Sequence, residues 1–257
     1  MLNKILLLTN EQINTQYEII FNKFECSAND TLAVVDNKEE LANCIKEGYA
    51  VLYVSLGTEF VSGVKYITDS LQDCDDDYFN MVFARQKGIP LTILETKRTT
   101  VREITVWDLP ALYELYDDEE VVRYVDKLYE YEEEKAFTEK YIENMYGFYG
   151  YGLWLVFDKN NGALIGRMGI SIRNIDGEEQ NELGYIVKRE YRNKGYAKEV
   201  CEAIIEYAHN NLFMDTLYIV CHDDNTASCR LAKALGFELM GESVGAEENY
   251  KIFVKST

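Results

Sequence analysis

The chain has 257 residues, which is long enough for two domains at the usual size of about 100–200 residues each. Its 45 acidic and 26 basic residues give a formal net charge of -19, which argues against a nucleic-acid partner because phosphate binding needs a basic surface. Its apolar runs are shorter than the ~18 residues of a membrane span, and residues 2–8 have neither the length nor the cleavage site of a signal peptide, so we expect a cytoplasmic protein without a membrane partner.

Residues 1–94 alternate predicted strands with predicted helices, which indicates a small parallel α/β domain. Apolar side chains at positions 13, 17, 20 and 24 fall near helical spacing and predict a helix over residues 11–24. The other predicted helices cover 37–48 and 75–87, and the predicted strands cover 4–8, 31–35, 49–55, 65–68 and 91–94. We recognise no family for this domain, so a role in recognition, dimerisation or regulation is open.

Residues that could bind a metal are few. The cluster Asp73, Asp75, Asp76 and Asp77 could hold a metal or a cationic group, but it could also supply the cap and acidic first turn of the helix that follows, which the helix dipole favours. We favour the capping interpretation. The six cysteines are scattered without a Cys-x-x-Cys pair and there are two histidines, so we expect free thiols and no metal site.

The second predicted domain, residues 95–257, begins with a strand over 95–104 and a helix over 106–116, entered through a capping box of Thr105 and Asp108. A long polar helical region follows, from 118 to about 146, and we interpret its glutamate run as a solvated helix face. Strands at 153–157 and 164–172 form a hairpin closed by Asn161-Gly162, because Asn-Gly supplies the positive φ angles of a tight turn. The last predicted elements are strands at 216–221, 237–240 and 251–255 and a helix at 226–235.

The most informative stretch is Asn181–Ala197, where a predicted strand breaks into a short basic glycine loop and then into a helix. The first amides of a helix have no intrahelical partner and the helix dipole is positive there, so such a turn can bind a phosphate group. Gly195 lets the backbone approach the ligand, and Ala197 keeps the next position small.

This segment resembles the pyrophosphate-binding motif of the GNAT acyl-CoA N-acyltransferases, Gln/Arg-x-x-Gly-x-Gly/Ala, which Arg192, Gly195 and Ala197 fill. The run from Asp224 through Phe237 is similar to the second signature of that family. With Glu-Leu-Gly-Tyr before the loop, the chain most resembles the branch that includes ribosomal-protein N-terminal acetyltransferases. The resemblance covers about the last two-thirds of the chain and implies the GNAT fold, a mixed, mostly antiparallel sheet flanked by helices.

The resemblance implies that acetyl-CoA or a related acyl-CoA is the co-substrate and that a neutral amine attacks the thioester directly, with no metal and no covalent enzyme intermediate. The thioester must be held, the oxyanion needs a donor, and protons must leave the amine and reach the thiolate. In this family the strand before the loop holds the pantetheine arm through its backbone, and one of its amides binds the oxyanion. Here those residues would be Tyr185, Ile186 and Val187, while Arg192, Asn193, Lys194, Gly195, Tyr196 and Ala197 would hold the pyrophosphate.

Glu182 is the candidate general base, because it lies two residues before the Gly-Tyr pair on the strand that leads to the thioester. A carboxylate there could take the proton directly or through a water, or bind the incoming ammonium. It could equally be a structural carboxylate paired across the sheet.

The second signature supplies Asn225 and Ser228. Many relatives place a tyrosine in this helix to protonate the thiolate, but the matching residue here is Ala232. Ser228 could hydrogen-bond the thiol sulfur as the acid and Asn225 the pantetheine, or both could simply cap the helix, with water protonating the thiolate. We expect no catalytic role for the nearby His222.

The acceptor amine cannot be identified from the residues. The branch implies a peptide or protein N-terminus, and the acidic surface also suits a small cationic amine. In the GNAT fold the aromatic segment at 146–154 would border the acceptor pocket, although it could instead be a packed hinge. A homodimer is possible. Two rivals to an enzyme are a non-catalytic acyl-CoA-binding sensor that the first domain reads out, and a scaffold with a vestigial transferase unit.

Overall fold

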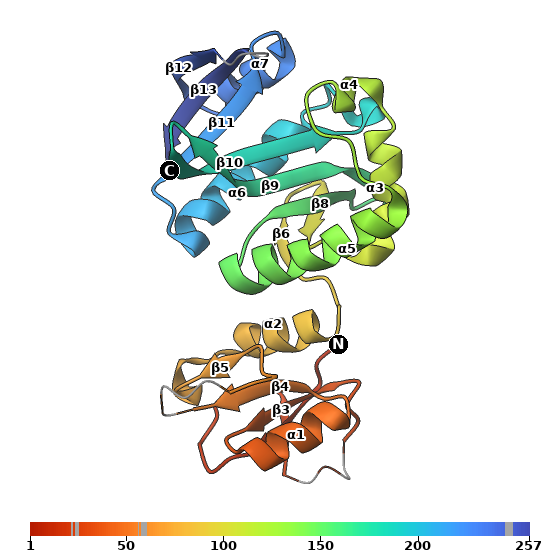
Figure 1. Cartoon of the computed structure of the whole chain (residues 1–257), viewed down its shortest axis with the longest axis vertical. Coiled ribbons are helices and arrows are strands. Elements are labelled where there is room, and N and C mark those ends of the chain that lie inside the picture. Colours follow the sequence, from red (N-terminus) through yellow and green to blue (C-terminus); the bar gives the residue numbers. More distant parts are fainter. Residues whose placement is uncertain (22, 24–25, 56, 58–60, 245–248) are drawn as a thin grey trace. The chain divides into compact units, whose positions relative to one another are not determined.

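The computed structural model describes residues 1–21, 23, 26–55, 57, 61–244 and 249–257 (Figure 1). Contacts divide the chain into two compact units, Met1–Leu91 and Thr92–Thr257. Each unit has its own sheet and its own apolar core.

The first unit is built on a parallel five-stranded sheet in the order β2-β1-β3-β4-β5. Helix α1 (Lys38–Lys46) packs Leu41 and Cys44 against one face, and α2 (Asp76–Gln86) packs Phe79 and Phe83 against the other. Because both faces are covered, β3 and β4 are buried along their whole length. This confirms the predicted parallel α/β architecture. The strands are β1 (Lys4–Leu8), β2 (Glu18–Ile20), β3 (Thr31–Val35), β4 (Ala50–Val54) and β5 (Ile67–Thr68).

Three predicted elements of the first unit need correction. The helix predicted over 11–24 is replaced by an irregular segment and strand β2, while Phe24 lies outside the described residues. Ile19 and Ile20 face opposite cores, which is the alternation of a strand. The strand predicted at 65–68 is shortened to β5, and the one predicted at 91–94 is β6 (Thr92–Glu95), which pairs with β7 (Thr99–Arg102) in the larger sheet.

The aspartate cluster caps a helix, as the capping interpretation predicts. Asp75 is the N-cap of α2 and accepts a hydrogen bond from the Tyr78 amide at 2.8 Å. Asp76 accepts hydrogen bonds from the Thr15 hydroxyl and the Gln16 amide, so it fastens the irregular segment to the start of the helix. The acidic first turn also complements the helix dipole.

The second unit is built on an eight-stranded sheet in the order β12-β13-β11-β10-β9-β8-β7-β6. Its neighbours are antiparallel except for β10 and β11, which are parallel. The predicted mixed, mostly antiparallel sheet is therefore confirmed. The predicted hairpin is β8 and β9, and Gly162 in its turn has a φ of 69°, whereas Asn161 does not reach positive φ. The remaining strands are β8 (Leu153–Asp158), β9 (Leu164–Ile175), β10 (Glu178–Val187), β11 (Thr216–His222), β12 (Glu238–Val244) and β13 (Asn249–Ser256).

Helices cover both faces of this sheet. Trp154 on β8 meets Tyr207 of α6 (Tyr196–Leu212) with ring centres 5.8 Å apart. Arg167 on β9 points to the opposite face of the sheet. Its guanidinium carbon lies 5.3 Å from the centre of the Tyr141 ring, at the end of α5 (Tyr131–Tyr141). Helix α7 (Thr226–Ala234) lies on the same face of the sheet as α6, because the Tyr185 hydroxyl on β10 contacts Ser228 of α7.

The long helical region predicted from 118 to 146 is interrupted. Helix α3 (Leu109–Tyr116), reached through the predicted Thr105–Asp108 capping box, is followed by the short α4 (Glu119–Val122), a non-helical stretch at 123–130, and α5. A π-helix, Ile142–Tyr149, continues α5. Buried Glu134 accepts a hydrogen bond from the Tyr129 amide at 3.0 Å, so this member of the glutamate run is not solvated and instead fixes the chain before α5.

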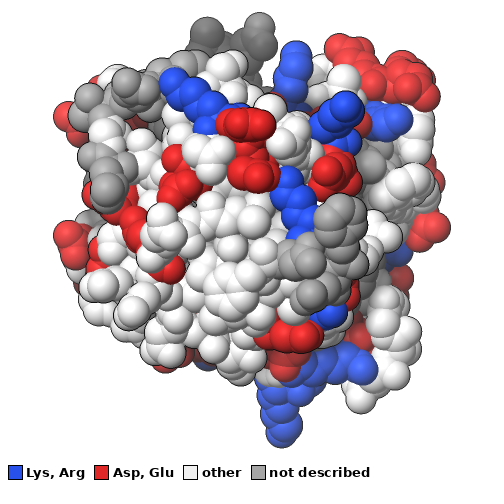
Figure 2. Space-filling view, turned by 90° about the horizontal axis from the view of Figure 1, so that it is seen from below, with Lys and Arg blue, Asp and Glu red and all other residues white. Residues whose placement is uncertain are grey.

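Figure 2 shows one face of the molecule. Acidic and basic side chains are mixed along its upper and right-hand parts, acidic side chains border its left side, and a broad area without charged side chains lies between them. None of the described helices is long and apolar enough to cross a membrane. The six cysteines are free thiols.

Candidate active site

The loop that the sequence singles out lies between β10 and α6 (Figure 1). Asn193 and Gly195 have φ angles of 59° and 80°, so the chain turns sharply before the helix begins at Tyr196. Gly195 is the N-cap residue, and no side chain caps the helix. The first amides of α6 are therefore left for another acceptor, which is the arrangement a phosphate site requires.

Arg192 anchors this loop through its side chain. Its Nε donates to the Val187 carbonyl at 2.9 Å, its Nη2 contacts Asp118 at 2.7 Å, and its Nη1 contacts Glu120. Asp118 also pairs with Arg189 at 3.0 Å, so two arginines fasten the start of α4 to the loop. The sequence predicts that Arg192 binds the pyrophosphate, but in the structure its guanidinium is already bound to protein groups.

Electrostatics keep this anchor charged. Desolvation by itself would raise the pKa of Asp118, but hydrogen bonds from the Glu120 amide and Arg189, with the charge of Arg192, hold it below its ordinary value. The carboxylate therefore stays ionised at neutral pH, and the contacts between α4 and the loop persist there.

A second arginine, which no sequence motif indicates, contacts the loop. Arg98, in the turn between β6 and β7, donates to the Lys194 carbonyl at 3.0 Å and to Glu199 on α6 at 2.6 Å. Its guanidinium carbon lies 4.0 Å from the centre of the Tyr196 ring, and a Cβ on Gly195 would lie 3.6 Å from its Nη2. Arg98 and Lys194 are 96 positions apart, so no local pattern could have connected them.

Strands β10 and β11 separate along the stretch predicted to hold the pantetheine arm (Figure 1). They pair at Glu182 and Tyr218, and these two fully described strands share no later pair. On its other edge, β10 stays paired with β9 as far as Val187. Apart from the Val187 carbonyl, which accepts from Arg192, the edge of residues 185–187 that faces β11 is therefore open, and an extended ligand could bind its backbone as an added strand does.

Ser228 contacts a tyrosine for which the sequence predicted only a backbone role. The Tyr185 hydroxyl lies 2.8 Å from Ser228 Oγ. Asn225 is the N-cap of α7 and accepts from the Ser228 amide at 3.1 Å, so the capping alternative holds for Asn225. Burial raises the pKa of Tyr185, which keeps its hydroxyl protonated. The pair thus places two hydroxyl groups beside α7, although the helix has Ala232 where many relatives have tyrosine.

Glu182 lies on the opposite face of β10 from Tyr185, because alternate residues of a strand point to opposite faces. Its carboxylate lies 3.4 Å from Nη1 of Arg173 on β9. Burial raises the pKa of Glu182 above its ordinary value, although the guanidinium of Arg173 opposes the shift. Both alternatives therefore stay open: the carboxylate is paired across the sheet, and its pKa is shifted upward, which is the direction that strengthens a general base.

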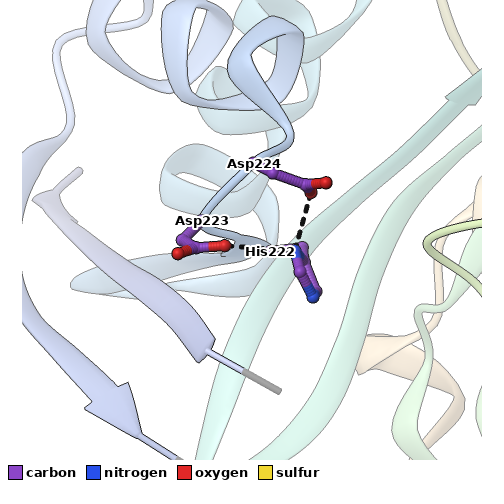
Figure 3. Close-up of side chains that lie close together, drawn as sticks. All are labelled: His222, Asp223 and Asp224. Atoms are coloured by element: carbon purple, nitrogen blue, oxygen red, sulfur yellow. Dashed lines mark hydrogen bonds and ion pairs between the residues drawn. The ribbon is translucent and has the colours of Figure 1, made fainter.

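His222, at the end of β11, forms a dyad with Asp224. Its Nδ1 lies 2.7 Å from the Asp224 carboxylate and 3.3 Å from that of Asp223, while the second ring nitrogen points away from both (Figure 3). Three ligand atoms lie within 4.8 Å of one another, as in some metal sites, but Arg123 already pairs with Asp224. The expectation that the protein binds no metal stays a prediction.

The aromatic segment at 146–154 is a packed hinge at one end. Tyr146 is fully buried, donates to the Leu153 carbonyl at 2.6 Å and accepts from the Ile104 amide at 3.3 Å. Phe148, in contrast, is 82% exposed. Only the exposed part of the segment, which includes Phe148, could therefore contact an acceptor.

Comparison with known proteins shows which family the chain belongs to. A family model described as an acetyltransferase (GNAT) domain matches residues 98–238, and the chain belongs to this family. The uncharacterized N-acetyltransferase YnaD of Bacillus subtilis (strain 168) is 31% identical over 150 residues, 58% of this chain and 84% of YnaD.

Solved structures share the fold. The ribosomal-protein-S5-alanine acetyltransferase of Vibrio fischeri has a TM-score of 0.55 at 21% identity, covering 63% of this chain and 95% of its own. RimL, a ribosomal L7/L12 alpha-N-protein acetyltransferase solved in complex with coenzyme A, has a TM-score of 0.55 at 19% identity, covering 65% and 98%. The resemblance and fold predicted from the sequence are confirmed.

Proposed function

We propose that the protein transfers an acetyl group from acetyl-CoA to a primary amine by direct attack. The observation that carries this proposal is the uncapped start of α6, which follows two positive-φ residues at the end of a strand whose free edge separates from β11. One continuous stretch of chain thus offers donors for a pyrophosphate and open backbone for a pantetheine arm.

In this proposal the backbone amides of residues 193–198 hold the pyrophosphate. The side chains of Lys194 and Arg98 add positive charge. Arg192 acts indirectly, because it fixes the loop to β10 and α4. The open edge of residues 185–187 holds the arm, and one of its amides stabilises the oxyanion that forms in the transition state.

Two side chains serve as proton acceptor and hydrogen-bond donor in the reaction. Glu182 takes the proton of the amine, and its raised pKa makes it a stronger base than an ordinary glutamate. Ser228, hydrogen-bonded to the Tyr185 hydroxyl, donates a hydrogen bond to the departing thiolate. The two groups lie on opposite faces of β10, so the amine and the thiolate are served from different sides.

The acceptor is a small-molecule or peptide amine, encountered in the cytoplasm. The printed names of two structural neighbours refer to ribosomal proteins, which keeps a peptide N-terminus among the candidates. The negative net charge also favours acceptors that approach as cations. Whether the protein acts as a homodimer is a separate prediction.

Turnover tests the proposal against a non-catalytic sensor. Release of the coenzyme A thiol is measured with acetyl-CoA and a panel of small amines and short peptides, with matched reactions lacking either component. Thiol release that needs both components supports the enzyme. Acetyl-CoA binding without turnover on any acceptor would favour the sensor, for which Ala232 in place of a tyrosine is the supporting observation.

A further inference from the structure

Arg173 makes a loose contact with its carboxylate partner. Its Nη1 lies 3.5 and 3.4 Å from the two oxygens of Glu182, beyond the about 2.7–2.9 Å of a charge-assisted hydrogen bond. Arg102, on the same sheet, meets Asp108 at 2.6 and 2.9 Å. The guanidinium of Arg173 therefore has donors available beyond those that Glu182 uses.

Arg173 is the open member of the pair, whereas the Glu182 side chain is only 13% exposed, and aromatic rings lie beside the arginine. Arg173 keeps 40% of its side chain exposed, and its guanidinium carbon lies 5.5 Å from the centre of the Tyr250 ring. The ring of Tyr250 lies 5.8 Å from that of His222, which lies 5.9 Å from that of Tyr124. Glu182 and Arg173 thus stand beside a partly aromatic surface on the face of the sheet opposite Ser228.

We propose that Arg173 binds a carboxylate of the acceptor and that the acceptor is an α-amino acid whose ammonium group meets Glu182. This inference rests on the proposed function. One negative and one positive side chain stand side by side, and an α-amino acid carries the two complementary charges on a single carbon. The planar guanidinium can bind a carboxylate through two parallel hydrogen bonds, and the neighbouring rings offer contact to the amino acid side chain.

Other acceptors fit the pair less well. A polyamine brings a second positive charge toward Arg173, and a peptide N-terminus brings a neutral carbonyl, so neither supplies the guanidinium with a counter-charge. In the reaction, the bound ammonium group first loses one proton to solvent and becomes the neutral amine. The amine nitrogen then bonds to the acetyl carbon while the carbon–sulfur bond breaks. The second proton leaves the nitrogen for Glu182, and coenzyme A departs as the thiolate, which takes a proton from water.

The test compares each of the twenty protein amino acids with its α-amide, which keeps the ammonium group and loses the carboxylate charge. Wild type is expected to acetylate at least one amino acid with a kcat/KM roughly 10- to 100-fold above that of its amide, since hydrogen bonds to charged groups contribute that much. Arg173→Gln removes the preference and Arg173→Lys keeps part of it. Arg230→Gln, the same change at an exposed position of α7, retains it.

The alternatives give different results. If Arg173 only neutralises Glu182, Arg173→Gln lowers the rates with acid and amide by the same factor, which overturns the proposal. If no amino acid is acetylated although acetyl-CoA binds, the substrate class is wrong, and thiol release with another amine would leave the proposed function intact. If acetyl-CoA does not bind, both proposals fail.

Discussion

At the residue scale, Glu182 has two interpretations that one substitution separates. Glu182→Gln keeps the shape of the side chain but cannot accept a proton, so we expect kcat/KM to fall by about 10²–10⁴-fold with the affinity for acetyl-CoA unchanged. Glu179→Gln, the same change at an exposed position of the same strand, serves as the control. An unchanged kcat/KM in Glu182→Gln would mean that the carboxylate is structural.

The pH dependence follows from the same residue. A base works only when deprotonated, and burial raises the pKa of Glu182, so activity in wild type should fall with decreasing pH at a value above that of an ordinary glutamate. Because the Arg173 guanidinium opposes this shift, Arg173→Gln should move the acid limb of the kcat/KM profile to still higher pH. A limb that stays in place would show that a different group titrates.

At the scale of elements, the loop depends on its attachment to α4. Asp118→Asn keeps an oxygen for the Glu120 amide but removes the charge that Arg189 and Arg192 contact. We expect acetyl-CoA to bind about 3- to 10-fold more weakly, measured by titration calorimetry. Asp117→Asn, at the exposed neighbouring position, is the control. Equal affinities in the two variants would show that the attachment does not position the loop.

The hinge after α5 should contribute to stability. Tyr146→Phe leaves the buried Ile104 amide and Leu153 carbonyl without this hydroxyl, so we expect the free energy of unfolding to fall by about 1–3 kcal/mol in denaturant titrations. Tyr149→Phe removes a hydroxyl from a partly exposed ring and should have little effect. If the two variants are equally stable, the buried hydroxyl does not hold the hinge.

Elements set by local patterns were the ones that could be predicted. The β10–loop–α6 segment combines strand alternation, glycine and helical spacing within a few residues, and its structure confirms that reading. The helix predicted over 11–24 was wrong because Ile19 and Ile20 pack on opposite faces of a sheet, which depends on strands elsewhere. Side-chain contacts such as Arg98 with Glu199 join distant parts of the chain, and spacing does not encode them.

The site was predictable to the same extent. The position of the candidate loop in the chain follows from a motif, whereas the partners of its side chains depend on tertiary structure. Arg192 fits the motif, yet the carboxylates that contact it come from α4, 72 and 74 positions away. The hydroxyl of Tyr185 reaches Ser228 only because β10 and α7 pack together.

At the scale of the whole molecule, the two units have separate cores, so a ligand of the second unit need not stabilise the first. Heating should then reveal up to two transitions, of which acetyl-CoA raises one. A single transition that acetyl-CoA raises as a whole would instead show that the two units unfold as one cooperative body.

The most direct test of acetyl-CoA binding at the α6 loop is the thermal unfolding of wild type, Gly195→Glu and Gly162→Glu, each with and without acetyl-CoA. Both glycines have positive φ, so the two variants share the backbone strain of the substitution. Only Gly195→Glu places a carboxylate beside the bound pyrophosphate. At 100 times the dissociation constant, acetyl-CoA should stabilise wild type and Gly162→Glu by about 2.7 kcal/mol, a rise of several degrees in Tm, and leave Gly195→Glu unchanged. An equal rise in Gly195→Glu, or none in wild type, would contradict acetyl-CoA binding at this loop.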